Sequence, residues 1–351
     1  MTHALTRREL IERTGALALA TPFLSLAACD GADRGRSLTQ LSGPTMGTTY
    51  QVKITDKPAH VDIDRLAVDV EHILETVNRQ MSTYRPDSEI SRFNAQRGES
   101  WTAVSPDTVL VAAEALRIAA LTDGAFDPTV GPLVDLWGFG AGGDGLRVPA
   151  RRRIDGLRAG IGHDKVRTAM APPGLGKAAG RVRVDLCGIA KGFGVDKLAR
   201  HLERIGVGHY LVEIGGELRG RGWNPRGGAW RVGIERPAPA PGGVQRVVQL
   251  DGGGLATSGD YRIFFEEKGR RYSHILDPRT GRPVDHGLAS VTVIAPTTIE
   301  ADGLSTAFMV LGPDNGLKLA EREGIAAFFI IKQGRGFAEA ASTAFLRYLV
   351  A

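Results

Sequence analysis

The stretch HYLVEIGGELRGRGWNPRGGAWRVGIERPAPAPGGVQRVVQL, residues 209–250, decides the fold class. It holds short apolar runs at 209–214, 229–235 and 246–250, which have the length and composition of strands. Glycine- and proline-rich sequence separates these runs, and strand follows strand instead of alternating regularly with helices. Such an order argues against a regular parallel β-α-β arrangement. We therefore predict an α+β fold, with largely antiparallel or mixed sheets and packed helices.

The rest of the chain extends this pattern in both directions. Further strands are predicted at 45–54, 181–186, 288–295 and 325–331, and helices at 60–81, 190–205, 299–311 and 314–323. One more helix is predicted where Ser105 can cap, Pro106 can open the first turn and Gly124 follows the end. Glycine- and proline-rich segments predict surface loops at 140–145, 172–180 and 237–243. We see no convincing boundary, so residues 43–351 are predicted to form a single domain.

The bulk composition is that of an ordinary globular protein. The chain has 351 residues, of which 42% are hydrophobic and 24% charged. Its net charge is +5, but the basic residues are scattered and form no long run. We therefore expect a solvated surface and no nucleic-acid partner.

The N-terminus has the pattern of an export signal. Basic residues precede an apolar run at 16–28, which is too short for a stable transmembrane helix. Leu26-Ala27-Ala28-Cys29 resembles a lipobox, in which Cys29 becomes the lipidated first residue. We predict a signal at 1–28, a linker at 29–42 and a lipid-anchored protein that faces the periplasm or the cell exterior; the alternative is a plain cleaved signal. Cys187 is then left without a disulfide partner.

One predicted helix carries polar groups on an otherwise apolar sequence. In IEADGLSTAFMV, residues 299–310, Asp302, Ser305 and Thr306 are spaced i, i+3 and i+4 and share one face. A carboxylate with hydroxyls one turn later supplies the oxygen ligands that Mg²⁺ prefers. The alternative is structural: Asp302 caps the helix and the hydroxyls bond back to backbone carbonyls.

A second candidate segment is VDLCGIAKGFGVD, residues 184–196, where a predicted strand enters a glycine-broken turn and a helix. Its glycines allow the backbone to approach a ligand closely, and Asp185 and Lys191 would face the same place. A helix N-terminus with a lysine favours anions, although the spacing is that of no standard phosphate loop. The alternative is a tight turn with a surface lysine.

Two further segments offer aromatic or titratable side chains. In the stretch 122–140, which should have little secondary structure, Phe126 and Trp137 could stack on a flat ring beside Asp127, or simply fill the core. His274 lies just before a turn and is a candidate base, although a lone histidine is more often structural. Ser258, in a turn of small residues that leads into a strand within 256–265, lacks the context of a hydrolase nucleophile.

Taken together and in this order, these segments resemble the FAD:protein FMN transferase family, the ApbE-type flavin transferases. The resemblance rests on GPTMGTTYQV, NRQMSTYRPDSEISRFN, GAFDPTVGPLVDLWGFG, DLCGIAKGFGVD, LVEIGGELRGRG, ATSGDYR, YSHILDPRTGRPV and ADGLSTAFMVLG, which span nearly all of the chain after the signal. Cys187 departs from the small residue common at its position, and the loops at 140–145 and 237–243 look long.

The resemblance implies a Mg²⁺-dependent enzyme that moves FMN from FAD onto a Ser or Thr hydroxyl of an acceptor protein and releases AMP. The acceptor would belong to a membrane or exported redox system. Water in place of the hydroxyl would give an FAD pyrophosphatase, and a third alternative is an FAD-binding lipoprotein without turnover.

The resemblance also assigns residues. It implies that FAD is bound by Met46, Tyr84, Ala125, Phe126, Asp127, Asp185, Lys191 and Leu276. It places Mg²⁺ at Asp302, Ser305, Thr306 and the backbone carbonyl of Gly188, and it gives the catalytic role to His274.

Overall fold

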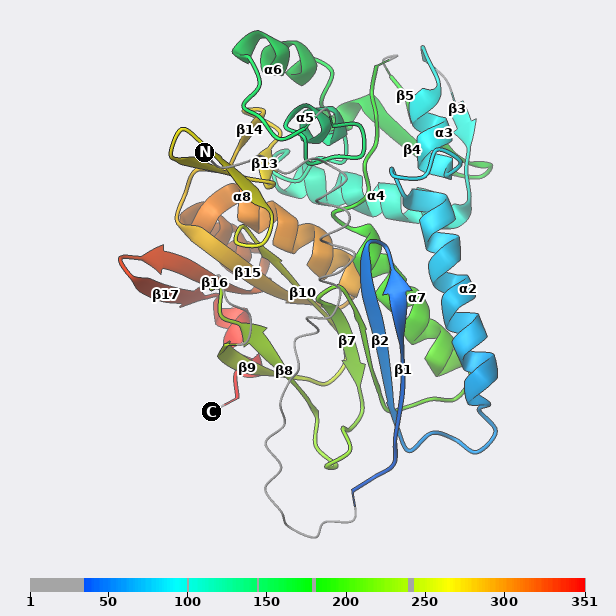
Figure 1. Cartoon of the computed structure of the whole chain (residues 1–351). Coiled ribbons are helices and arrows are strands. Elements are labelled where there is room, and N and C mark those ends of the chain that lie inside the picture. Colours follow the sequence, from blue (N-terminus) through cyan, green and yellow to red (C-terminus); the bar gives the residue numbers. More distant parts are fainter. Residues whose placement is uncertain (1–34, 100, 144, 179–180, 239–242, 351) are drawn as a thin grey trace, which may run out of the picture.

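An eight-stranded antiparallel sheet forms the centre of the molecule in a computed structural model of the chain (Figure 1). The structure describes residues 35–99, 101–143, 145–178, 181–238 and 243–350; the predicted signal and Cys29 lie outside these ranges. In spatial order the strands are β1 (Leu38–Thr45), β2 (Thr48–Thr55), β6 (Tyr210–Ile214), β7 (Glu217–Arg221), β10 (Gly254–Gly259), β15 (Leu288–Ala295), β16 (Ala326–Gln333) and β17 (Gly336–Ala341). The predicted α+β class is therefore confirmed.

Both faces of this sheet are covered. The helices α2 (Ile63–Met81), α7 (Ala190–Arg204) and α8 (Thr298–Glu323) pack together on one face, with α8 against β10 and β15. The hairpin β8 (Trp230–Glu235) and β9 (Val244–Leu250) and the C-terminal 3₁₀ helix η2 (Thr343–Tyr348) cover the other. All eight residues of β15 are buried, because Val291 and Val293 pack towards the helices while Ile294 packs towards the hairpin.

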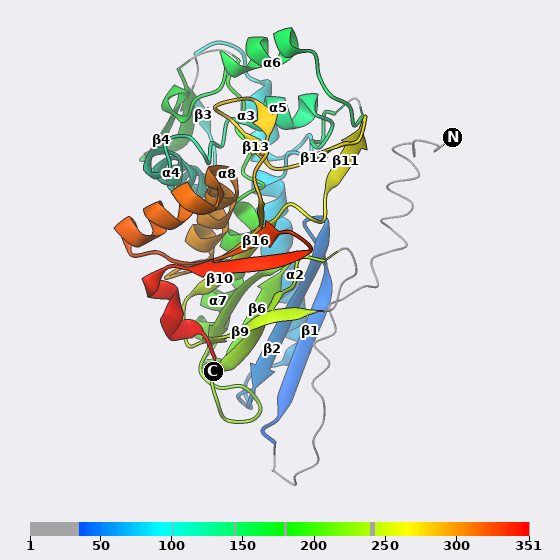
Figure 2. The ribbon, with the colours of Figure 1, turned by 90° about the vertical axis from the view of Figure 1, so that its left-hand side faces the viewer.

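Smaller elements form a cap beyond the helical layer (Figure 2). They are α3 (Glu89–Ala95), β3 (Trp101–Ala103), α4 (Pro106–Leu121), α5 (Gly131–Leu136), α6 (Arg151–Arg158), η1 (His163–Lys165), β4 (Val166–Met170), β5 (Pro173–Lys177), β11 (Phe264–Glu267), β12 (Arg270–Ser273), β13 (Leu276–Asp277) and β14 (Arg282–Pro283). Among the described residues, no helix is long and apolar enough to cross a membrane.

Local sequence signals account for the helix boundaries. The Ser105 hydroxyl caps α4 by accepting from Thr108 N, and Pro106 opens its first turn, as predicted. The helices predicted at 299–311 and 314–323 are the two halves of α8. They meet at Gly312, where the backbone is not helical, because Pro313 cannot donate the next hydrogen bond.

The strand predicted at 181–186 is wrong. The segment is extended, and Val182, Val184 and Leu186 are buried in the alternation that suggested a strand. The side chain of Asn94 takes the place of a partner strand: Oδ1 accepts from Val184 N at 2.7 Å, and Nδ2 donates to Val184 O at 2.8 Å. A side-chain amide therefore satisfies backbone groups that a sheet would otherwise pair.

Two segments predicted as loop or turn are strands instead. β5 occupies most of 172–180, and β10 includes the first residues of 256–265. Their glycines serve close packing: a Cβ at Gly176 would lie 2.2 Å from the Trp101 ring, and one at Gly254 would lie 2.4 Å from Thr298 Cα. Small residues here mark crowded strands, not turns.

Other boundaries differ from the prediction as well. The strand predicted at 45–54 is a hairpin, in which Met46 and Gly47 turn with φ of 48° and 73°. β1 begins at Leu38, so the sheet starts inside the predicted linker. The stretch 122–140, expected to have little secondary structure, contains the short helix α5.

Candidate active site

The first turns of α8 place three oxygen-bearing side chains beside the start of α7. Asp302 and Ser305 are buried, and Thr306 is half-buried. Asp302 does not cap the helix, since that role belongs to Thr297. Instead its Oδ2 accepts from Gly192 N of α7 at 2.9 Å. The Ser305 hydroxyl donates to Asp302 O at 2.9 Å, which is the bond to a backbone carbonyl that the structural alternative predicts. It also lies 2.8 Å from the Ser258 hydroxyl, which that alternative did not include.

Glycines let the turn within residues 184–196 approach the polar face of α8. A Cβ at Gly188 would lie 3.6 Å from Thr306 Oγ1 and 3.3 Å from the Phe126 ring. A Cβ at Gly192 would lie 2.4 Å from Thr298 O and could not be accommodated. The glycine-broken turn and the polar face of α8 are therefore in contact, as the two sequence motifs predicted.

Lys191 adds a cation between two buried carboxylates. Its Nζ lies 3.2 Å from Glu217 Oε1 on β7 and 3.8 Å from Asp302 Oδ1. Burial raises the pKa of Asp302 and of Glu217, and the attraction of Lys191 offsets only part of this effect. Burial would lower the pKa of Lys191, but the two carboxylates outweigh it and raise the pKa, so the ammonium stays charged.

The balance of charge in this cluster favours a further cation. One ammonium faces two carboxylates, and Glu217 Oε2 is buried without a hydrogen-bond partner. Two buried carboxyl groups with raised pKa values and an unsatisfied buried oxygen are what a divalent cation such as Mg²⁺ would satisfy, because the cation favours their ionised form. The residues present therefore fit a magnesium site.

His274 lies just beyond β12 and has a defined tautomer. Its Nδ1 is 3.0 Å from Ile263 O, and because a carbonyl can only accept, Nδ1 carries the proton. Nε2 is then free to take a proton. Burial lowers the pKa of His274, the hydrogen bond to Ile263 and the charge of Asp260 raise it, and the charge of Lys191 lowers it further. The net pKa of His274 therefore lies below the ordinary value.

The sequence matches the ApbE family over residues 46–329. This chain belongs to the ApbE family. An FAD:protein FMN transferase of Haemophilus influenzae is 44% identical to it, over 96% of this chain and 97% of that protein. The solved structure of the flavin transferase ApbE from Vibrio cholerae superposes with a TM-score of 0.83 at 44% identity, covering 90% of this chain and all of that one. The ApbE protein from Thermotoga maritima gives a TM-score of 0.80 at 30% identity, covering 90% of this chain and 100% of that chain.

The other residues predicted to bind flavin nucleotide in this ApbE family member differ in exposure. Met46 forms the β1–β2 turn, and its Cε approaches α7 at Gly194, where a Cβ would lie only 3.1 Å away. Tyr84 is 66% exposed, whereas Ala125, Phe126 and Leu276 are buried. Their roles stay predictions, and Tyr84 is the most exposed of these four residues.

Two of the side chains predicted to bind FAD accept hydrogen bonds from backbone N–H groups of the protein itself. Asp127 Oδ1 accepts from the Thr129 amide and hydroxyl at 2.8 and 2.6 Å, and its Oδ2 accepts from His163 N at 3.0 Å. Asp185 Oδ1 accepts from Cys187 N at 2.9 Å. Trp137, the alternative stacking partner, is buried with Nε1 donating to Gly281 O, so it is a core residue.

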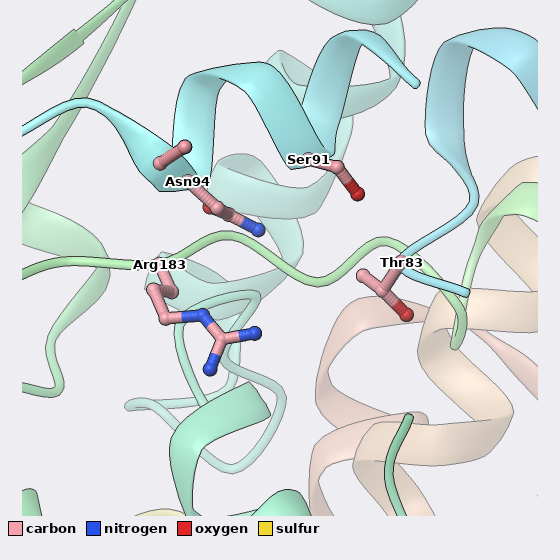
Figure 3. Close-up of a pocket in the computed structure, with 5 residues that line it drawn as sticks. Thr83, Ser91, Asn94 and Arg183 are labelled. Atoms are coloured by element: carbon pink, nitrogen blue, oxygen red, sulfur yellow. The ribbon is translucent and has the colours of Figure 1, made fainter. Parts of the chain in front are cut away.

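A polar pocket adjoins this ApbE site. It has a volume of about 310 Å³ and is lined by Thr83, Ser91, Asn94, Ala95 and Arg183 (Figure 3). A smaller hollow shares three of these residues and reaches Asp185. Because Thr83 precedes Tyr84 in the chain, the pocket extends from the predicted flavin nucleotide positions.

Sequence reasoning missed two residues of the site. Ser258 is hydrogen-bonded to Ser305, but β10 was interpreted as a turn. Glu217 pairs with Lys191, but the short strand β7 was not predicted. The available signal was a charged residue directly after the Gly215-Gly216 turn, where an antiparallel partner of β6 must begin.

Proposed function

We propose that this protein transfers FMN from FAD to an acceptor protein. The observation that carries the proposal is the contact of Lys191 with Asp302 on the α8 face, in a chain 44% identical to proteins named FAD:protein FMN transferase. A lysine beside a polar helix face suits a diphosphate, and a neutral histidine suits the removal of a proton from an attacking hydroxyl.

Magnesium is part of the proposal. Asp302, Ser305, Thr306 and the backbone carbonyl of Gly188 would hold it, since these oxygen atoms belong to neighbouring residues around an excess of negative charge. When bound, Mg²⁺ would neutralise charge on the diphosphate of FAD, as divalent cations do in phosphoryl transfer.

The chain's own residues would perform the remaining work. Lys191 and the N-terminus of α7 attract the diphosphate of FAD. Nε2 of His274 takes the proton of a Ser or Thr hydroxyl on the acceptor. That oxygen forms a bond to the FMN-side phosphorus, the bridging P–O bond breaks, and AMP departs with its electron pair. The product is FMN in phosphoester linkage to the acceptor.

The test is to incubate the protein with FAD, Mg²⁺ and candidate acceptor proteins from redox systems. Each acceptor is then denatured, and its mass is measured by mass spectrometry. We expect an acceptor that carries one added FMN, with AMP released in equal amount. Free FMN and AMP without a modified protein would indicate the pyrophosphatase alternative. Intact FAD after prolonged incubation would indicate a binding protein without turnover.

We further propose that the protein is exported and anchored in a membrane through lipidated Cys29, and that its acceptor belongs to a membrane or exported redox system. The support is the lipobox-like sequence alone. Fractionation of cells that express the Cys29→Ala variant tests this: we expect the variant to leave the membrane fraction, and an unchanged distribution would refute the anchor.

A further inference from the structure

The extended segment 181–186 carries Asp185 without the support of a sheet. No strand within the described ranges pairs with it, although Val182, Val184 and Leu186 are buried in alternation. Asp185 lies between two of these apolar residues and is half-buried, on the opposite side of the segment. A slip of one residue would turn its carboxyl group towards the core. Contacts other than a partner strand must therefore fix the register at Asp185.

The side-chain amide of Asn94 fixes the residue directly before Asp185. Its Nδ2 donates to Val184 O at 2.8 Å, and its Oδ1 accepts from Val184 N at 2.7 Å. Figure 3 shows this side chain, on the last turn of α3, directed towards the extended segment that carries Arg183. Asn94 and Asp185 also line the same small hollow. Because the backbone already engages both polar atoms of the amide, Asn94 has the pattern of a clamp and not of a ligand contact.

A second segment holds Asp185 from the other side. Asp185 N donates to Pro128 O at 2.7 Å. A Cβ at Gly131 would lie 3.2 Å from Asp185 Cβ, so this glycine leaves room for the carboxyl group. Pro128 directly follows residues 125–127, which are predicted to bind FAD. The Asn94 clamp therefore sets Asp185 in register with another predicted part of the FAD site.

A buried lysine supports the turn that carries Asn94. Lys177, at the end of β5, is only 5% exposed. Its Nζ donates to Gln96 O at 2.9 Å and to Asn94 O at 3.4 Å, and it lies 4.7 Å from the centroid of the Phe93 ring. Lysine side chains bind the last carbonyls of a helix in this way, because those groups have no partner within the helix. Lys177 therefore anchors the C-terminal end of α3, from which Asn94 reaches Val184.

We propose that Asn94 is a positioning residue that holds Asp185 in register for FAD, and that Lys177 fixes Asn94 in turn. This inference rests on the proposed function, because it names residues that prepare the FAD site. Asn94 acts through Asp185, so its effect on FAD affinity must vanish when the Asp185 carboxyl group is absent. A direct contact between Asn94 and FAD would instead keep its effect without Asp185.

The experiment is a double-mutant cycle of Asn94→Ala and Asp185→Ala. The Kd for FAD is measured by calorimetry without an acceptor and without Mg²⁺, so that binding is observed without turnover. The matched control is Asn224→Ala. Asn224 also bridges backbone groups, since its Oδ1 accepts from Arg226 N at 2.8 Å and its Nδ2 donates to Ala229 O at 2.7 Å. It lies in the loop between β7 and β8, at the opposite end of the molecule from α3 (Figure 1).

We expect Asn94→Ala to raise the Kd for FAD about tenfold, an effect typical of residues coupled in one hydrogen-bond network. The KM for FAD should rise in parallel, while kcat at saturating FAD changes little. In the Asp185→Ala background the same substitution should change the Kd by less than about twofold. Asn224→Ala should lower the Tm and leave the Kd unchanged. An Asn94 effect of equal size with and without Asp185, or an unchanged Kd in Asn94→Ala, would overturn the proposal.

Lys177→Met keeps the proposal testable if Asn94→Ala does not fold. Methionine retains an apolar stem over Phe93 but cannot donate to the carbonyls at the end of α3. This variant should also raise the Kd for FAD, and only where Asp185 is present. A folded Lys177→Met variant with the Kd of the wild type would refute the support of Asn94 by Lys177.

The positioning role and the proposed function can fail separately. If the wild type binds FAD and the cycle shows the coupling, but no acceptor gains FMN, the positioning role stands and the proposed transfer fails. If the wild type attaches FMN to an acceptor, but Asn94→Ala binds FAD as tightly as the wild type, transfer stands and the role of Asn94 is refuted.

Discussion

At the scale of single residues, His274 is prepared to act as a base. The carbonyl of Ile263 fixes its proton on Nδ1, which leaves Nε2 unprotonated. Burial lowers the pKa of the ring, and the charge of Lys191 acts in the same direction. The hydrogen bond to Ile263 and the charge of Asp260 oppose both effects without cancelling them. The neutral imidazole therefore persists to a lower pH than in a free histidine.

We expect this to appear in the pH dependence of transfer. Because the pKa of His274 lies below the usual 6.5, the ring stays mostly neutral when the pH is lowered to 6.5. We therefore expect kcat to fall only at a more acidic pH. His274→Asn keeps a donor for Ile263 O but removes the base, so kcat should drop by about 10²–10⁴-fold. FAD affinity should change little.

The measurement is kcat for wild type and variant across the acidic range, with FAD binding followed by fluorescence as the control. An acidic limb that is the same in His274→Asn would remove His274 from the proton transfer.

At the scale of elements, the site depends on how α7 and α8 meet. Gly192 leaves room for the backbone at Thr298, and Asp196 ties the helices together. The Asp196 carboxylate accepts from Thr298 N at 3.1 Å and from Ile299 N at 2.9 Å, and Arg219 pairs with it at 3.0 Å. One side chain of α7 therefore satisfies two backbone N–H groups in the first turn of the helix that carries Asp302.

Asp196→Ala should lower the free energy of unfolding by about 2–3 kcal/mol, because it leaves two helix N–H groups without their acceptor and the Arg219 guanidinium without its carboxylate partner. It should also weaken activity, since the start of α8 loses its fixed position relative to α7. Urea unfolding and kcat measure the two effects.

Asp62→Ala is the matched control. Asp62 caps α2 by accepting from Arg65 N at 2.9 Å, but it is exposed, so its loss should cost about 1 kcal/mol without affecting kcat. Equal activity in the two variants would contradict the proposed coupling of α7 and α8.

Elements also show what the sequence alone can and cannot predict. The long helices α2, α4, α7 and α8 were predicted within a few residues, since their apolar periodicity and caps are local, whereas the short helices α3, α5 and α6 were not predicted. The polar face of Asp302, Ser305 and Thr306 followed from the same periodicity. β10 was missed because Gly254–Gly259 has few large residues, and its strand conformation comes from pairing with β7 and β15. Ser258 was missed with its strand, since no local pattern records a partner distant in sequence. The turn after β6 was a local signal for β7, but it did not reveal that Glu217 pairs with Lys191.

At the scale of the whole molecule, the candidate site joins segments that are far apart in the chain. Met46 comes from the β1–β2 turn, Phe126 and Gly188 from loops of the middle region, and Asp302 from α8. The unfolded chain cannot hold these groups together. A ligand that contacts all of them therefore binds the native state far more tightly than the unfolded state, and stabilises the whole fold.

We therefore expect FAD and Mg²⁺ together to raise the Tm more than the sum of their separate effects. At a hundredfold excess over its Kd, a ligand stabilises the native state by about 2.7 kcal/mol. Asp302→Asn should lose the increment that depends on Mg²⁺, because an amide is a weaker ligand for this cation than a carboxylate. Asp285→Asn, which changes a carboxylate that is 80% exposed, should keep it. Thermal unfolding with each ligand alone and with both measures the increments, and equal Mg²⁺ effects in the two variants would show that the cation binds elsewhere.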